Sequence, residues 1–124
     1  MKLTRKQQAI FNELQQERGE NLDKQFLNIA AFLVAFRLTE CNNINDLYII
    51  YDNLWINNEI LDADTIDNYS PETIKEITGH NYKTIKNNIL NNNKIYLLNY
   101  YSIKNGRETL KNCFIKLDAN YNIF

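Results

Sequence analysis

The stretch that decides the fold is SPETIKEITGHNYKTIKNNILNNNKIYLL, residues 70–98. Ser70 followed by Pro71 predicts a helix start, because serine caps free N–H groups and proline is favoured at the first helical position. Gly79 is expected to end that helix, and a second helix is predicted over residues 81–92. The apolar and aromatic run that follows predicts a strand.

The sequence after this point, KIYLLNYYSIKNGRETLKNCFIKL at residues 94–117, predicts a β-hairpin. Its centre is Asn105-Gly106, a dipeptide favoured in two-residue turns between antiparallel strands. In that register Leu97 faces Phe114 across the two strands. Apolar side chains fall on both faces of the hairpin, so we expect helices to cover part of it.

Three further helices are predicted before residue 70, at about residues 4–18, 22–39 and 45–57, each with apolar residues at helical spacing. Thr4 with Gln7 fits a capping box at the start of the first helix. The expected fold class is therefore mainly α with a C-terminal β-hairpin.

The length of 124 residues is typical of a single domain. Within it we distinguish a helical, acidic half at residues 1–69, the helix–turn–helix and hairpin at 70–117, and a tail at 118–124. The tail ends in Ile123 and Phe124, so we expect it to dock on the rest of the chain.

The composition is strongly biased toward residues with AT-rich codons. There are 21 Asn, 16 Ile, 10 Lys and 8 Tyr among the 124 residues. The bias indicates an AT-rich bacterium, or one of its phages or plasmids, as the source. It also supplies a non-functional explanation for any exposed surface rich in Asn and Lys.

Charge is unevenly distributed along the chain, although the net charge is only −1. Residues 1–70 hold 6 Lys or Arg and 11 Asp or Glu, whereas residues 71–124 hold 8 and 4. Residues 38–70 contain seven acids and no Lys or Arg. Only the basic half is therefore expected to face a phosphate backbone.

Several classes of function lack the residues that they need. The chain has one histidine, His80, and two distant cysteines, Cys41 and Cys113, which we expect to be reduced. This set offers no zinc site and no nucleophile paired with a histidine base. We therefore expect a protein that is not an enzyme and that uses no cofactor and no metal.

Three aspartates, Asp62, Asp64 and Asp67, are the nearest approach to a cation site. An EF-hand loop needs more ligands, a central glycine and a terminal glutamate, so a solvated connector is favoured. The longest apolar stretch, residues 26–36, is 11 residues long, and a membrane span needs roughly 20. No signal peptide is recognisable, and the expected location is cytoplasmic.

The order helix, turn, helix, hairpin resembles the winged-helix superfamily of DNA-binding proteins, over residues 70–117 only. Ile74 and Ile77 fall on the inner face of the first helix, Gly79 at the turn glycine, and Ile85 where the family keeps a β-branched residue. The resemblance implies a winged-helix-like domain with an N-terminal helical extension, acting in transcription regulation or DNA replication.

Two residues depart from the winged-helix pattern. Lys75 stands where the pattern has a small residue, so its stem is expected to extend outward. Thr78 replaces an apolar residue before the turn.

A recognition helix contacts bases through its N-terminal residues and one outward face, where Asn pairs with adenine and Lys with guanine or phosphate. Such residues suit AT-rich double-stranded DNA; single strands, stacked on the strand tyrosines, remain an alternative. The predicted DNA-binding residues are Asn81, Tyr82, Lys83, Lys86, Asn87 and Lys94 around the second helix, and Lys104, Arg107 and Lys111 on the hairpin.

The acidic half suggests a protein contact, either between two subunits of a homodimer or with a basic partner. The predicted interface residues are Tyr48, Asp52, Trp55, Ile56 and Glu59. The alternative function follows from the same surface: a small mobile-element protein that inhibits a host nucleic-acid enzyme, its acidic half imitating DNA.

Overall fold

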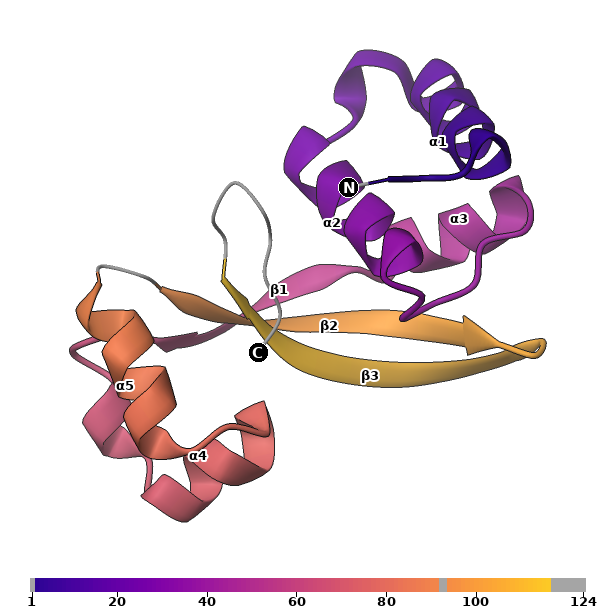
Figure 1. Cartoon of the computed structure of the whole chain (residues 1–124). Coiled ribbons are helices and arrows are strands. Elements are labelled where there is room, and N and C mark those ends of the chain that lie inside the picture. Colours follow the sequence, from indigo (N-terminus) through magenta and orange to yellow (C-terminus); the bar gives the residue numbers. More distant parts are fainter. Residues whose placement is uncertain (1, 92–93, 117–124) are drawn as a thin grey trace. The chain divides into compact units, whose positions relative to one another are not determined.

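The computed structural model describes residues 2–91 and 94–116, and within them it has five α-helices and a three-stranded antiparallel sheet of order β1-β2-β3 (Figure 1). The predicted docking tail, with Ile123 and Phe124, lies outside the described residues. The elements are α1 (Arg5–Arg18), η1 (Gly19–Asn21), α2 (Lys24–Ala35), α3 (Ile44–Asp52), β1 (Trp55–Leu61), η2 (Ile66–Asn68), α4 (Pro71–Thr78), α5 (Tyr82–Leu90), β2 (Ile95–Lys104) and β3 (Arg107–Lys116).

The chain divides into two compact units. Unit 1 comprises Met1–Trp55 and Tyr100–Lys111, and unit 2 comprises Ile56–Asn99 and Asn112–Phe124. The turn end of the hairpin therefore belongs with the N-terminal helices, while the helix–turn–helix belongs to unit 2.

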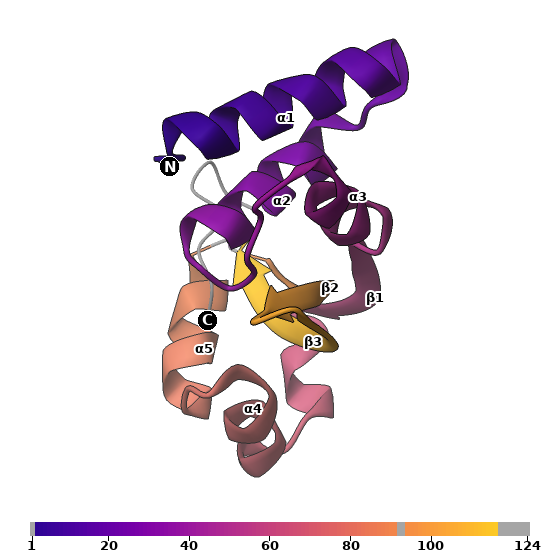
Figure 2. The ribbon, with the colours of Figure 1, turned by 90° about the vertical axis from the view of Figure 1, so that its right-hand side faces the viewer.

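Unit 1 is built on three amphipathic helices, with α1 and α2 each packed against α3 (Figure 2). The predicted capping box is present: Thr4 and Gln7 each accept a hydrogen bond from the other's backbone N–H. The buried residues of these helices include Leu14, Leu33 and Leu47, all fully buried.

The end of β2 in unit 1 is held by the segment that follows α2. Ile103 donates its N–H to Thr39 Oγ1 at 2.9 Å, and Ile103 O accepts the N–H of Glu40 at 2.7 Å. Ser102 Oγ donates to Leu38 O at 2.8 Å. These bonds satisfy buried polar groups that would otherwise be costly.

The prediction for residues 45–57 is wrong at its C-terminal end. The helix α3 stops at Asp52, and Trp55–Leu61 forms strand β1 instead. Tryptophan and isoleucine favour strands, and pairing with β2 supplies a long-range partner that a local helical pattern cannot reveal.

Unit 2 has a separate apolar core beneath α4 and α5. Tyr69, Ile77 and Tyr82 pack around it, half-buried. The buried members of this cluster are Leu61, Ile66, Ile74, Ile85, Ile89, Ile95, Leu97 and Phe114.

The predicted hairpin is confirmed. Asn105 and Gly106 have φ of 53° and 74°, the positive values of a type I′ turn. Strands β2 and β3 are equally long on either side of this two-residue loop, as the predicted register requires. Burial differs between the strands: β2 is largely buried, whereas residues 107–112 of β3 are exposed.

Within the described ranges no helix has the length and apolar character needed to cross a membrane.

Candidate nucleic-acid interface

The helix α4 begins and ends where its sequence predicts, whereas α5 ends at Leu90, earlier than the predicted residue 92. Ser70 Oγ accepts the N–H of Thr73 at 3.1 Å, and Pro71 occupies the first turn of α4. Gly79 adopts a left-handed conformation with φ 76°, and its N–H donates to Lys75 O at 2.9 Å. Glycine suits this position because it carries no Cβ.

Both departures from the winged-helix pattern are accommodated locally. Lys75 is exposed, and its Nζ donates to Gly79 O at 3.2 Å, so its stem extends outward as expected. Thr78 is only 5 % exposed, and its hydroxyl donates to Ile74 O at 2.6 Å and accepts the N–H of His80 at 3.1 Å. The buried hydroxyl thus takes part in the turn between the helices.

The first residues of α5 are partly committed to the fold. Asn81 is the N-cap, and its Oδ1 accepts the N–H and the hydroxyl of Thr84 at 2.9 and 2.8 Å. Tyr82 donates its hydroxyl to Asp67 Oδ1 at 2.6 Å. The Nζ of Lys86 lies 5.4 Å from the centre of the Tyr82 ring. Asn81 and Tyr82 are therefore less available for bases than the sequence suggested.

The outward face of α5 is formed by Lys83, Lys86 and Asn87, all exposed, while Ile85 and Ile89 are buried in the core. The side chains of Lys83 and Asn87 make no hydrogen bond or ion pair with the residues that the structure describes, and the two residues are one helical turn apart. Lys94, also exposed, directly precedes β2.

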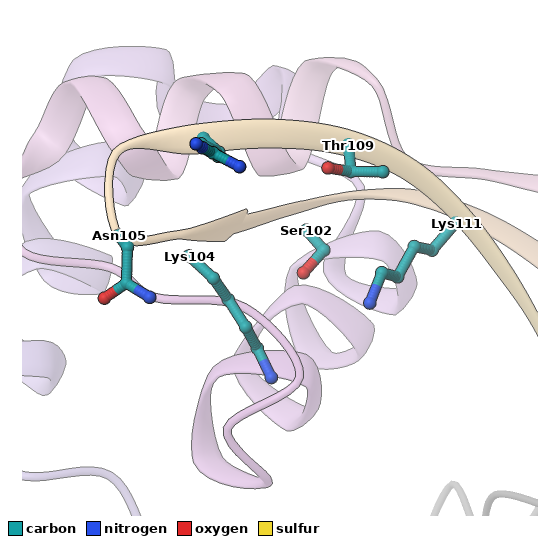
Figure 3. A pocket seen from close by; sticks show the side chains of 6 residues that line it. Ser102, Lys104, Asn105, Thr109 and Lys111 are labelled. Carbon is teal, nitrogen blue, oxygen red and sulfur yellow. The ribbon is translucent and has the colours of Figure 1, made fainter.

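The hairpin gathers three cations around one pocket. A pocket of about 490 Å³ is lined by Ser102, Lys104, Asn105, Arg107, Thr109 and Lys111 (Figure 3). These residues share one face because strand side chains alternate, and in the confirmed register Lys104 lies opposite Arg107 and Ser102 opposite Thr109. In Figure 3, Ser102, Lys104 and Lys111 point to the same side of the strands.

Among the described residues, no carboxylate lines this pocket. Lys104, Arg107 and Lys111 are all exposed, and none forms a salt bridge with a residue in the described part of the chain. Cations, hydroxyls and a glycine-containing turn together suit an anion with several oxygens, such as a phosphate group. Ser102 and Thr109 were not among the predicted site residues, although the hairpin register places both on the same face as Lys104.

The predicted DNA-binding residues are divided between the units: those around α5 lie in unit 2 and the hairpin cations in unit 1. The acidic stretch 38–70 is divided too. In the described part of unit 2, five lysines accompany six carboxylates, and in that of unit 1 nine cations accompany eight carboxylates. The acidic and basic halves of the sequence are therefore not the units of the fold.

The predicted protein interface is partly occupied by contacts within unit 1. Tyr48 donates its hydroxyl to the carboxylate of Glu17, and Asp52 pairs with Arg18 at 2.6 Å. Trp55, at the start of β1, is 41 % exposed. Ile56 and Glu59 belong to unit 2.

Asp62 serves a turn in unit 2. Its Oδ1 accepts the N–H groups of Asp64 and Thr65 at 2.9 and 3.0 Å. Desolvation acts to raise the pKa of this carboxyl, but these hydrogen bonds outweigh it and lower the pKa. Over residues 2–91 and 94–116, no group of three or more His, Cys, Asp or Glu is placed to hold a metal ion.

In comparisons with known proteins, no family model, no curated protein and no solved structure matches the chain.

Proposed function

We propose that this protein binds double-stranded DNA in a winged-helix-like manner, with α5 as the recognition helix and the β2–β3 turn as the wing. The role would be that of a transcription regulator or replication accessory in an AT-rich bacterium, phage or plasmid. The observation that supports the proposal is the hairpin pocket, whose described lining residues include Lys104, Arg107 and Lys111 but no carboxylate.

The outward face of α5 supports the same function. Lys83 and Asn87 are exposed on one side of the helix, with side chains suited to guanine, phosphate and adenine. The hairpin would supply affinity through phosphates, and α5 would supply sequence preference through bases.

A salt titration of DNA binding tests the proposal. Wild-type protein is mixed with a labelled duplex from the DNA flanking its own gene, and anisotropy is recorded from 50 to 300 mM salt. Each phosphate neutralised contributes about 0.9 to the log–log slope of affinity against salt. Lys104→Ala with Arg107→Ala and Lys111→Ala should therefore flatten the slope by up to about 2.7.

Lys24→Ala is the matched control, because Lys24 is an exposed cation of unit 1 that lines a different pocket. It should leave the slope unchanged. If wild-type protein shows no salt-dependent affinity for any duplex, the proposal falls. If the protein instead copurified with a host nucleic-acid enzyme, and this depended on Trp55, the alternative function, inhibition of that enzyme by protein contact, would be favoured.

A further inference from the structure

Arg37 occupies a backbone conformation that arginine seldom adopts. The helix α2 ends in a Schellman motif, in which Leu38 donates its N–H to Leu33 O at 2.9 Å and Arg37 donates to Val34 O at 3.0 Å. Arg37 is the left-handed residue of this motif, with φ 57°. Glycine is usual there, because a Cβ in this conformation costs roughly 1–2 kcal/mol.

Among the residues that the structure describes, the other non-glycine residue with positive φ is Asn105. Asparagine tolerates this conformation well and is favoured in type I′ turns, so Asn105 is explained by the hairpin itself. Nothing in the helix end requires an arginine. An unfavourable residue kept at a strained position is a reason to look for a function of its side chain.

The surroundings of Arg37 supply a candidate. Arg37 lines a pocket of about 320 Å³ together with Lys104, which also lines the hairpin pocket. The two pockets therefore share a cation. The remaining lining residues are Gln7, Val34, Thr39, Glu40, Cys41 and Asn42.

Glu40 lines the pocket that contains Arg37, and it is the one carboxylate among the described residues that line either pocket. The cations that line them are Arg37, Lys104, Arg107 and Lys111. The Oε2 atom of Glu40 accepts the N–H of Asn105 at 3.1 Å, which ties Glu40 to the hairpin turn. Because the cations outnumber the carboxylate, the surface formed by these two pockets suits a chain of phosphates better than a neutral ligand.

We infer that Arg37 and Lys104 hold a phosphate group of the DNA backbone in this pocket, which extends the hairpin's phosphate contacts to the C-terminal end of α2. The guanidinium presents paired donors that match phosphate oxygens, and lysine adds a point charge. This inference rests on the proposed function, because the phosphate is that of the bound duplex. It enlarges the interface within unit 1 to a residue outside the hairpin.

The test uses the opposite effects of one substitution. Arg37→Gly removes the Cβ strain, so Tm should rise by a few degrees. The same variant loses one phosphate contact, so the salt slope on the duplex should fall by about 0.9 and affinity several-fold. Arg37→Lys keeps both a cation and a Cβ at this position. Its salt slope should therefore equal that of the wild type, and its Tm should stay below that of Arg37→Gly. If Arg37 had only a structural role, Arg37→Gly would change the Tm and leave the salt slope of DNA binding unchanged.

A second probe separates this inference from the proposed function. Pyrophosphate should raise the Tm of the wild type and raise that of Arg37→Gly much less. If the wild type binds DNA but Arg37→Gly keeps the full salt slope, the inference falls and the proposed function stands. If pyrophosphate protection depends on Arg37 while no duplex binds, the pocket holds free phosphate compounds and both the inference and the proposed function are overturned.

Discussion

Arg18 and Asp52 join the last turn of α1 to the end of α3 through two charge-assisted contacts, 2.6 Å from Nη1 to Oδ1 and 2.8 Å from Nη2 to Oδ2. The guanidinium also lies 4.6 Å from the centre of the Tyr48 ring. The hydrogen bond to Asp52 is the main cause of a raised pKa for Arg18. Two residues predicted for a partner surface, Tyr48 and Asp52, thus hold unit 1 together.

Replacing Arg18 should destabilise the protein modestly. The pair is partly exposed, at 34 % and 46 % for the two side chains, so solvent screens it. We expect Arg18→Ala to lower the free energy of unfolding by about 1 kcal/mol in urea titrations. Arg18→Lys should recover only part of this, because lysine lacks the paired donors. A double-mutant cycle with Asp52→Ala that shows no coupling would contradict this account.

Gly79→Ala should destabilise unit 2 for a purely conformational reason. A Cβ built at Gly79 meets nothing within 4 Å, so steric overlap with other residues contributes nothing. The left-handed φ of 76° remains unfavourable for alanine, at a cost of roughly 1–2 kcal/mol. Gly79→Asn should cost less, because asparagine tolerates this region. Equal losses for the two variants in urea unfolding would argue against the left-handed turn.

The two thiols predict a loss of stability at high pH. Burial raises the pKa of Cys41 to about 11 and that of Cys113 to about 12, from an ordinary 9.0. The folded state therefore binds more protons than the unfolded state between pH 9 and these values. The stabilisation is complete below about pH 9 and is lost as pH rises, by at most about 1.4 kcal/mol per pH unit for each thiol.

The measurement is the free energy of unfolding from pH 8 to 10.5 in a reducing buffer. Cys41→Ser and Cys113→Ser should each reduce the slope, because serine does not titrate in this range. Native thiols should also react slowly with alkylating reagents at pH 8, since the thiolate is the nucleophile. Rapid alkylation of Cys41 in the folded protein would show that this thiol is not buried.

Local signals in the sequence account for much of the fold. Ser70, Pro71 and Gly79 bound α4 because capping and left-handed turns depend on side chains near in sequence. Asn105-Gly106 likewise determines the hairpin and its register. The strand at Trp55–Leu61 was missed because its partner lies about 40 residues further along the chain, beyond any local pattern.

The candidate site was predicted unevenly for the same reason. Side-chain type and strand parity locate Lys104, Arg107 and Lys111 on the hairpin. The pairing of Tyr82 with Asp67 and the position of Arg37 beside Lys104 depend on tertiary packing, and the sequence carries no signal for either.

Trp55 provides a test of the expected homodimer. Trp55 is 41 % exposed, and exposed large apolar residues often mark interfaces. We expect Trp55→Ala to shift the protein toward monomer in sedimentation velocity, and to weaken DNA binding only through lost avidity. A wild type that sediments as a monomer at 100 µM would remove this surface as a dimer contact.

Substitutions of Asn87 and Lys83 should distinguish contacts to bases from contacts to phosphates on α5. Both are exposed on the outward face, but an amide can pair with adenine whereas an ammonium attracts any phosphate. Asn87→Ala should therefore cost about 1–3 kcal/mol on the preferred duplex and little on random DNA. Lys83→Ala should weaken both alike and lower the salt slope by about 0.9. Competition assays with specific and random duplexes measure both. Unchanged specificity in Asn87→Ala would exclude this face of α5 as the recognition surface, and the hairpin cations would then bind DNA without selecting a sequence.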